Sequence, residues 1–292
     1  MMDLDRERLA ALGAVVTEGS FDAAARQLHV TPSAISQRIR ALELAVGRVL
    51  VTRGRPVRAT PSGAILVRAA RQMEAIAADA IHALSVDTPA GAVTVPLAVN
   101  ADSLATWLLP ALAGLADVVV ALHREDQDRT ADLLREGLVW AAVTASPDPV
   151  PGCRVEPLGT MRYHACAAPD FARRHFPDGV ERAALATAPV VNYDRDDRLQ
   201  DRFLELRVGV PPLPPRHYVP SSEAFVTAVR LGMGWGMVPD LQARDLPKGC
   251  LTVLDPEGAV DVALYWAQPR RSTPTLERVA AAVRTAARRE LG

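Results

Sequence analysis

The 292-residue sequence predicts an α/β protein in which an N-terminal winged helix-turn-helix is joined by a long helix to a two-lobed α/β domain. Three observations predict this fold class. Short segments of helical periodicity come first, an alanine-rich helical pattern follows Pro61, and strand and helix patterns alternate from Val93 onward. The expected domains are residues 1–60, 61–90 and 91–292, with lobe I at about 91–160 and 266–292 and lobe II at about 161–265.

Positive charge is concentrated near the N-terminus, although the whole chain has a formal net charge of -1. Nine arginines and a single acid, Glu43, lie between Arg26 and Arg71. This segregation predicts a polyanion-binding module joined to a second domain. The normal apolar fraction of 49% excludes a globally disordered chain.

Three cysteines, Cys153, Cys166 and Cys250, lie far apart in the sequence and indicate neither a compact zinc site nor a disulfide framework. The N-terminus lacks the basic start of a signal peptide, and no apolar stretch approaches the roughly 18 residues of a membrane span. We therefore expect a soluble, cytoplasmic protein without a metal and without a membrane partner.

The first sixty residues predict three helices and a β-wing. One helix ends at Gly19, a second begins after the N-cap Ser20, and a third begins after the N-cap Thr31 with Pro32 at its first position. The third helix buries Ile35, Ile39 and Leu42. Its opposite face carries Ser33, Ser36, Gln37 and Arg40 at i, i+3, i+4 and i+7. Short polar residues near a helix start, followed by Gln and Arg, suit a helix that enters the DNA major groove.

Strand-like residues at 49–51 and at Val57 flank the turn Arg53-Gly54-Arg55-Pro56, which predicts a basic wing. The DNA-contacting residues expected from these patterns are Thr31, Ser33, Ser36, Gln37, Arg40, Arg53 and Arg55. A small structural bundle with solvated arginines is the alternative. The nine-to-one basic bias favours DNA binding.

The run SFDAAARQLHVTPSAISQRIRALELAVGRVLVTR and the following RPVRATPSG resemble the DNA-binding domain of LysR-type transcriptional regulators. Ala-Ala-x-x-Leu, Pro-Ser-Ala-Ile-Ser, Arg-x-Leu-Glu and Thr-Pro-x-Gly occur in that order. One departure is the stretch RVLV at 48–51, where many relatives have an aromatic residue. The resemblance extends over the whole chain. It implies a homodimeric or homotetrameric transcriptional regulator rather than an enzyme, with an operator in double-stranded DNA and RNA polymerase as partners.

A long helix is predicted from Pro61 to about Val86, with a break at residues 88–91. Its apolar residues follow 4-3-4-3-4 spacing, and we call them the predicted seam: Leu66, Ala70, Met73, Ala77, Ala80 and Leu84. A helix packed on its own domain is one interpretation. The resemblance favours a dimerising helix, which would set the spacing of two DNA half-sites.

Alternating strands and helices follow residue 91 and predict a mostly parallel sheet. Strands are expected at 93–99, 118–122, 139–143, 163–167, 190–193, about 217–219 and 262–267. Helices are expected from the caps Asp102 and Ser103 through Leu112, and at 128–136, 169–175, 181–186, 197–206, 222–231 and 275–290. Two such lobes resemble a periplasmic-binding-protein-like effector domain.

Ligands of open α/β sheets bind at the carboxyl ends of the strands, so polar residues there are candidates. Hydroxyl-bearing helix starts suit a carboxylate, and the nearby acids suit a cation, so a basic amino acid in the interlobe cleft meets both needs. Each acid alone fits a solvated surface residue or a helix cap better than a ligand contact, and only their shared location at strand ends favours a binding site. The expected effector-binding residues are Asn100, Ala101, Asp102, Ser103, Glu125, Asp126, Thr144, Asp194, Ser222, Glu223 and Trp235.

The stretch VNADSLATWLLPAL, with PSSEAF and GMGWGMVPD, resembles the arginine/lysine-responsive branch of the LysR-type family, often called ArgP or LysG. This resemblance implies L-lysine or L-arginine as the effector, no cofactor, and control of an exporter gene for basic amino acids. Activation and repression both remain open.

Other classes of protein were weighed against this interpretation. An amino-acid-binding enzyme or transport component could use the same lobes, but the basic N-terminal module argues against it. An architectural DNA binder would leave the second domain without a purpose. The glycines at 232–236 lack GxGxxG spacing and are expected to allow close backbone approach at a turn. His164 and Cys166 share one strand face and could form a nucleophile pair, and His123, Asp126 and Asp128 could chelate a metal only weakly.

Overall fold

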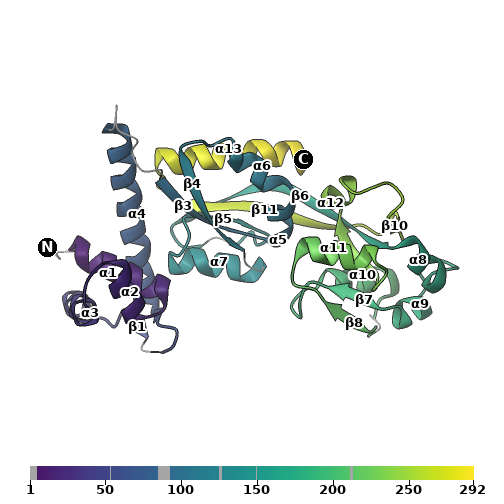
Figure 1. The fold of residues 1–292 in the computed structure, drawn as a ribbon, viewed down its shortest axis with the longest axis horizontal. Helices are drawn as coiled ribbons and strands as arrows, with labels where there is room; N and C mark the ends of the chain where they lie inside the picture. Colours follow the sequence, from purple (N-terminus) through teal and green to yellow (C-terminus); the bar gives the residue numbers. More distant parts are fainter. Residues whose placement is uncertain (1–4, 53, 85–92, 125–126, 149, 211–212) are drawn as a thin grey trace. The chain divides into compact units, whose positions relative to one another are not determined.

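The computed structural model describes residues 5–52, 54–84, 93–124, 127–148, 150–210 and 213–292 (Figure 1). The chain forms two compact units. The first comprises Met1–Val99, Leu115–Glu156 and Trp266–Ala281, and the second comprises Asn100–Gly114, Pro157–Tyr265 and Ala282–Gly292. Residues 100–114 and 282–292 therefore group with the second unit, whereas the sequence placed them in lobe I.

Three helices open the first unit: α1 (Arg6–Glu18), α2 (Phe21–Gln27) and α3 (Pro32–Val46). Their predicted limits are confirmed. Gly19 adopts the left-handed conformation that ends α1, with φ 63°. The Ser20 hydroxyl accepts a hydrogen bond from the backbone N–H of Ala23, and the Thr31 hydroxyl accepts one from Ala34.

The three helices pack around one apolar core, in which the predicted residues Ile35, Ile39 and Leu42 are buried. The wing follows as an antiparallel pair, β1 (Val51–Thr52) and β2 (Arg58–Ala59). The Thr52 hydroxyl donates to the carbonyl of Arg58 and accepts from its backbone N–H, which closes the wing. Arg53, at the predicted turn, lies outside the described residues.

The segment between the wing and the next helix is held by Thr60 and Gly63. The Thr60 hydroxyl accepts a hydrogen bond from the Gly63 backbone N–H at 3.1 Å and donates one to the Val49 carbonyl at 2.8 Å. A β-carbon added at Gly63 would lie 1.9 Å from the carbonyl oxygen of Leu50. Only glycine fits at this position.

The long helix α4 (Pro61–Leu84) begins at the predicted residue. Part of the predicted seam is wrong, however, because Leu66 and Ala70 are 8% and 4% exposed and belong to the core of α1–α3. The three short helices leave that core open on one side, and α4 closes it. The large exposed apolar side chains among the described residues of α4 are Ile65, Met73 and Ile76, and Ala80 of the predicted seam is exposed as well. The side chain of Leu84 and the expected break at 88–91 lie outside the described residues.

The α/β part of the first unit contains three parallel strands, with β3 (Val93–Val99) between β4 (Val118–Arg124) and β5 (Ala141–Thr144). Helix α7 (Gln127–Glu136) and the start of α13 (Pro274–Glu290) lie on opposite faces of these strands (Figure 1). This arrangement matches the alternating pattern in the sequence, since each crossover helix covers a sheet face.

These strands belong to a seven-stranded sheet of order β10-β6-β11-β5-β3-β4, with β9 also paired to β6. The added strands are β6 (Cys153–Ala167), β9 (Gly236–Pro239), β10 (Thr252–Val253) and β11 (Val260–Pro269). The expected parallel pairing is confirmed for β3 with β4 and β5, whereas β9 and β10, which the sequence did not predict, run antiparallel to β6. Strands β6 and β11 each contain a boundary between the two units.

The second unit also contains the parallel pair β7 (Val190–Asn192) and β8 (Arg216–Tyr218). Its helices include α8 (Pro169–His175), α9 (Arg182–Thr187), α10 (Leu199–Val208), α11 (Ser222–Arg230) and α12 (Asp240–Arg244). Sequence periodicity missed α12, β9 and β10, which are short. No helix in the described part of the chain is long and apolar enough to cross a membrane.

The helical segment after β3 consists of α5 (Ala101–Ser103), a π-helical turn at Leu104–Leu108 and α6 (Leu109–Ala113). Asp102 and Ser103 were expected to cap this segment, and that expectation is wrong. Asn100 occupies the N-cap position without a side-chain capping bond, and Asp102 and Ser103 lie in the first turn. The Asp102 carboxylate therefore remains available to other partners.

Candidate functional site

The polar face of α3 is fully presented to solvent, because Thr31, Ser33, Ser36, Gln37 and Arg40 are all exposed. The Thr31 and Ser33 hydroxyls lie 2.9 Å apart, and the Ser36 hydroxyl donates to the carbonyl of Pro32 at 3.0 Å. The opposite face of the helix is fixed in the core, so these five side chains have one defined direction. A rigid helix with an exposed polar face can place several donors against base edges at once.

A groove of about 780 Å³ brings α3 and the wing together. Ser36, Gln37 and Arg40 line it from α3, and Gly54 and Arg55 line it from the wing. Arg55, predicted from a separate segment, therefore shares one concave surface with the recognition residues. Thr31 and Ser33 lie outside this groove, on the exposed N-terminal turn of the same helix.

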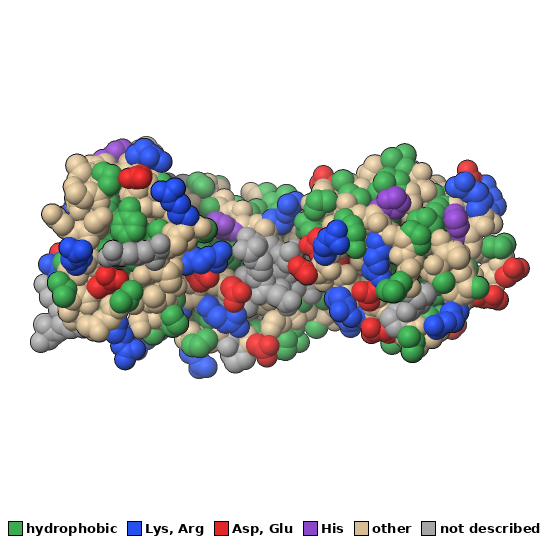
Figure 2. Space-filling model, turned by 90° about the horizontal axis from the view of Figure 1, so that it is seen from below, with side chains coloured by type: hydrophobic (Ala, Val, Ile, Leu, Met, Phe, Trp, Pro, Cys, Tyr) green, Lys and Arg blue, Asp and Glu red, His purple; other side chains and the backbone are tan. Residues whose placement is uncertain are grey.

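The arginines of this module are not equivalent. The Arg38 guanidinium contacts the Glu7 carboxylate at 2.5 Å and is tied to α1. Arg40 and Arg55 have no acidic partner among the described residues. Figure 2 shows basic side chains spaced over the N-terminal module rather than gathered in one patch. Exposed, unpaired guanidinium groups can neutralise backbone phosphates at several points along a duplex.

The second cluster of predicted residues is centred on Asp102 in the second unit. The Tyr163 hydroxyl of β6 donates to one carboxylate oxygen of Asp102 at 2.8 Å, and the Ser222 hydroxyl of α11 donates to the other at 2.6 Å. Burial raises the pKa of Asp102, and the two hydroxyl donors oppose that rise. Burial and the Asp102 charge together hold the pKa of Tyr163 well above its usual value.

Two buried polar side chains flank Asp102 without partners. Asn100 is 5% exposed and Ser103 is 0% exposed. The amide oxygen of Asn100 and the hydroxyl oxygen of Ser103 have no hydrogen-bond partner in the described ranges of the chain. Buried polar atoms without partners are rare in folded proteins, so a water or a bound polar group is expected beside them.

Two residues of this cluster were not among the predicted site residues. Tyr163 lies inside β6 and at the amino end of the strand expected at 163–167, so a rule that selects residues after the carboxyl ends of strands could not select it. Asp197 accepts hydrogen bonds from the backbone N–H groups of Tyr193 and Leu199. Burial raises the pKa of Asp197, and the charge of Asp102 raises it further. Asp197 follows the strand-end run 192–194 by three residues, which is a signal that could have identified it.

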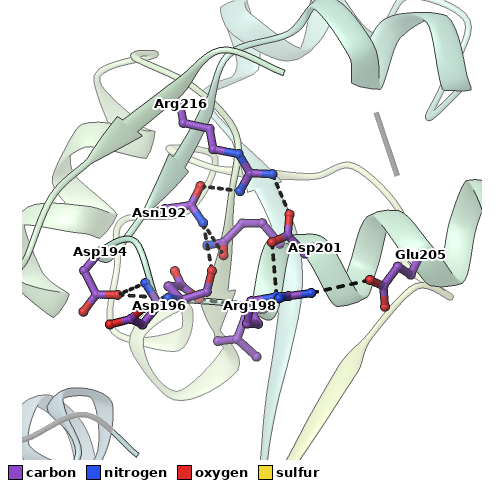
Figure 3. A network of polar contacts seen from close by, with 10 residues as sticks. Asn192, Asp194, Asp196, Arg198, Asp201, Glu205 and Arg216 are labelled. Carbon is purple, nitrogen blue, oxygen red and sulfur yellow. Dashed lines mark hydrogen bonds and ion pairs between the residues drawn. The ribbon is translucent and has the colours of Figure 1, made fainter. Parts of the chain in front are cut away.

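Asp194 has a local structural role, because its carboxylate accepts the backbone N–H groups of Asp196 and Asp197 and closes the turn after β7 (Figure 3). The neighbouring network, also in Figure 3, joins Arg216 to Asn192 and to Asp201. These contacts fix the loop that carries Asp197.

The remaining predicted residues are dispersed. Trp235 is fully buried and packs against Phe203 with ring centres 5.5 Å apart, so it belongs to the core of the second unit. Glu223 is exposed in the first turn of α11, and Ala101 is half-buried in the first turn of α5. Thr144 belongs to the first unit, where its hydroxyl accepts from the Ser146 backbone. Glu125 and Asp126 lie outside the described residues.

The geometry also bears on the enzyme and metal alternatives. His164 contacts the Asp240 carboxylate at 2.7 Å, and burial raises the pKa of the Cys166 thiol to about 12. A thiol with that pKa stays protonated at neutral pH and is a poor nucleophile. Within the described ranges, no group of three or more His, Cys, Asp or Glu residues could hold a metal. Asp126 and the side chain of Asp128 lie outside those ranges.

Gly234 and Gly236 allow the close approach that was predicted for this stretch, whereas Gly232 adopts a left-handed φ of 76°. A β-carbon at Gly234 would lie 2.7 Å from the Pro189 carbonyl oxygen, and one at Gly236 would lie 2.7 Å from the Phe225 ring.

A winged helix-turn-helix joined by a long helix to a two-lobed α/β domain defines the class of ligand-responsive DNA-binding regulators. Two family models match the chain. Residues 7–64 match the bacterial regulatory helix-turn-helix protein of the LysR family, and residues 89–288 match the LysR substrate binding domain. The chain belongs to the LysR family of bacterial transcriptional regulators.

Three comparisons place it near the LysG and ArgP regulators. The transcriptional regulator LysG of Mycobacterium tuberculosis is 46% identical over 286 residues, covering 97% of this chain and 94% of that protein. The crystal structure of ArgP from M. tuberculosis superposes with a TM-score of 0.87 at 45% identity, over 98% of both chains.

The third is the full-length LysG from Corynebacterium glutamicum with bound effector Arg. Its structure superposes with a TM-score of 0.79 at 38% identity, over 98% of this chain and 99% of that one. The same protein is named a lysine export transcriptional regulatory protein, and it is 40% identical over 284 residues, which cover 96% of this chain and 97% of that protein.

Proposed function

We propose that this protein binds an operator through α3 and the wing and regulates transcription in response to L-arginine or L-lysine. The observation that carries the effector assignment is the Asp102 carboxylate. It is half-buried and accepts hydrogen bonds from hydroxyl groups of two different elements. In the chain it lies between Asn100 and Ser103, each of which has a buried polar atom without a partner among the described residues. The arginine bound to the C. glutamicum relative supports the same ligand class.

The chemistry of Asp102 favours a cationic group on the ligand. An ionised carboxylate has about four acceptor sites, and Tyr163 and Ser222 occupy two of them. Neither hydroxyl carries a charge, and no Lys or Arg in the described part of the chain forms an ion pair with this partly buried carboxylate. An ammonium or guanidinium group of the effector supplies that cation. We infer that the Ser103 hydroxyl, which lies in the first helical turn and has no partner among the described residues, donates to the effector's carboxylate.

Calorimetry with four amino acids tests the effector assignment. Arginine and lysine are expected to bind, glutamate is expected not to bind, and leucine is expected to bind much more weakly. Equal binding of leucine and lysine would contradict the cation argument, and binding of none of the four would contradict the amino-acid assignment. Asp102→Asn should abolish the preference for basic side chains, whereas Glu223→Gln, at an exposed acid beside Ser222, should retain it.

Operator recognition is assigned to the exposed face of α3, with Arg40 and Arg55 on phosphates or in the minor groove. Thr31, Ser33, Ser36 and Gln37 lie where base edges would be reached, and Arg53 completes the proposed contact set. A binding assay at fixed salt, with specific and random duplexes, tests this assignment. A specificity ratio near one would indicate an architectural DNA binder instead.

The target gene is inferred from the name of the C. glutamicum relative, a lysine export regulator. We infer that this protein controls a gene for a basic amino-acid exporter, with RNA polymerase as a further partner. Footprinting on the region upstream of such a gene, with and without arginine, tests the inference. An unprotected upstream region would contradict it.

Assembly into a dimer or tetramer is assigned to the exposed apolar side chains of α4, Ile65, Met73 and Ile76. Met73 belongs to the predicted seam, whereas Ile65 and Ile76 take the place of Leu66 and Ala70, which are buried in their own module. Two copies are needed to present two recognition helices to one duplex. A chain that sediments as a monomer at micromolar concentration would contradict this assignment.

A further inference from the structure

Gly137, at the turn between α7 and β5, makes an unusually close approach to α4. Its φ of 71° is left-handed, and it ends α7 as the C-cap glycine. A β-carbon at this position would lie 2.9 Å from the backbone nitrogen of Arg68 and 3.0 Å from a methyl carbon of Val67. The turn and the helix are therefore in direct backbone contact, with no space for a side chain between them.

Two further contacts fix the same turn on α4. The Arg68 guanidinium donates to the carbonyl of Arg135 in the last turn of α7, which satisfies an acceptor that the helix itself leaves free. Leu138, directly after Gly137, packs on the apolar core that α4 shares with the DNA-binding helices. The α7–β5 turn thus touches both the backbone of α4 and the interior of the DNA-binding module.

A separate contact, about three turns further along α4, joins it to the α/β part of the same unit. The Asp79 carboxylate accepts the backbone N–H of Thr275 at 3.1 Å, at the start of α13. A carboxylate is favoured at a helix N-terminus by the free N–H groups and the helix dipole. Helix α4 is thereby held at two points, and only the first of them also reaches the DNA-binding core.

The α7–β5 turn is joined through β5 to Thr144, which ends that strand and which the sequence predicts to contact the effector. A ligand that displaces β5 at Thr144 also acts on Gly137, because the turn leads directly into that strand. Because no side chain lies between Gly137 and the backbone of α4, a movement of the turn must either move α4 or break the contact.

We propose that this contact, made by Arg135, Gly137 and Leu138 against Val67 and Arg68, transmits the effector-bound state to the DNA-binding module. The proposal rests on the proposed function, since it requires an effector in the α/β domain. It assigns the regulation to one place in the fold. Effector and operator are coupled through a difference in how this turn contacts α4 in the two states.

The test measures the operator affinity of the full-length protein with and without saturating arginine. The ratio of these two affinities is the coupling ratio. Gly137→Ala forces the turn away from α4. Gly152→Ala is the matched control, because Gly152 has a comparable φ of 83° and nothing within 4 Å of an added β-carbon. Arg68→Met removes the cap on α7 but keeps the aliphatic stem, and Arg68→Lys keeps a donor.

Gly137→Ala and Arg68→Met are expected to lower the coupling ratio at least about fivefold, toward one. Arginine affinity, measured by calorimetry, should stay within about twofold of the wild type. Gly152→Ala and Arg68→Lys should retain most of the coupling. A wild-type ratio in both Gly137→Ala and Arg68→Met would overturn the proposal while leaving arginine binding, and hence the proposed function, intact.

Hydrogen exchange on the wild-type protein keeps the test decisive if a variant fails to fold. Adding arginine should change amide exchange in residues 64–71 of α4 and leave α2 unchanged. Unchanged exchange at 64–71, in a protein that calorimetry shows to bind arginine, would overturn the proposal. A wild-type protein that binds no arginine would overturn both this proposal and the proposed effector.

Discussion

The DNA-binding surface and the Asp102 site are built in opposite ways. The recognition residues lie on one exposed helix, with a short wing next to it in the sequence. The Asp102 site joins residues 61 and 120 positions apart in the chain, and its polar atoms are largely buried. The residues of an exposed site on a single helix can be predicted from helical spacing. Sites assembled from distant segments depend on strand pairing and packing, which spacing does not specify.

The largest effect is expected when a charge is placed at a seam position that is buried in the core, compared with a seam position that is exposed. Leu66→Glu places a charge in the core of the DNA-binding module and should lower its free energy of unfolding by about 3–5 kcal/mol. Met73→Glu, at a side chain that is 48% exposed, should change stability by only about 0.5 kcal/mol but weaken self-association. Urea unfolding and sedimentation separate the two. Equal stability loss in both variants would contradict the assigned burial.

Asp102→Ala should produce the next largest effect, on effector binding alone. The effector's cation loses its partner, and the Tyr163 and Ser222 hydroxyls lose their acceptor, so arginine binding should weaken by about 2–4 kcal/mol. Operator affinity without arginine should stay unchanged, because the DNA-binding module is intact. Calorimetry and a binding assay on the same preparation measure both. Wild-type arginine affinity would refute the assignment of Asp102.

Gln37→Ala should cost about 1–3 kcal/mol on the specific operator and little on random DNA. Arg40→Ala should weaken both, with a salt slope shallower by about 0.9. Arg38→Ala is the control, because the Arg38 guanidinium is tied to Glu7 and should contribute little to either duplex. Anisotropy at several salt concentrations gives all three values. An unchanged specificity ratio for Gln37→Ala would contradict the recognition-helix assignment.

The smallest expected effect is a pH dependence of stability. Burial raises the pKa of Asp102 and Asp197 above the unfolded value near 3.8. The stability that these groups contribute is fully present below that value and is lost as pH rises through the folded pKa values. The double variant Asp102→Asn with Asp197→Asn should therefore gain stability relative to the wild type as pH rises from 4 to 7. Urea unfolding across that range checks the difference, and a constant difference would contradict the raised pKa values.

Much of the fold followed from local rules. Ser20 and Thr31 cap their helices, Gly19 ends one, and β3 spans the predicted residues. The errors have physical causes. Leu66 fits a heptad pattern equally well on a dimer interface and on its own core, and spacing cannot distinguish the two. The antiparallel partners of β6 are short strands with little periodicity of their own.

The candidate site was predicted only in part. Asp102 and Ser222 were both selected at strand ends, and they do meet. Trp235 was expected near a ligand but is fully buried in the core. An aromatic residue beside glycines fits a packing role as well as a binding one, so the sequence did not distinguish the two. Tyr163 carries no strand-end signal, and its contact with Asp102 follows from the register of β6 alone.

Gly63 is part of the family signature because of its role in packing, and it makes no contact with DNA in the proposed arrangement. It belongs to the Thr-Pro-x-Gly stretch, and its lack of a side chain lets α4 begin against the Leu50 carbonyl. In a library of all single substitutions, position 63 should accept no replacement, whereas the exposed position 37 should accept many and change only which duplex is preferred. The signature residues by which the module is recognised therefore reflect its packing and not its DNA sequence preference. Two members with identical signatures can read unrelated operators.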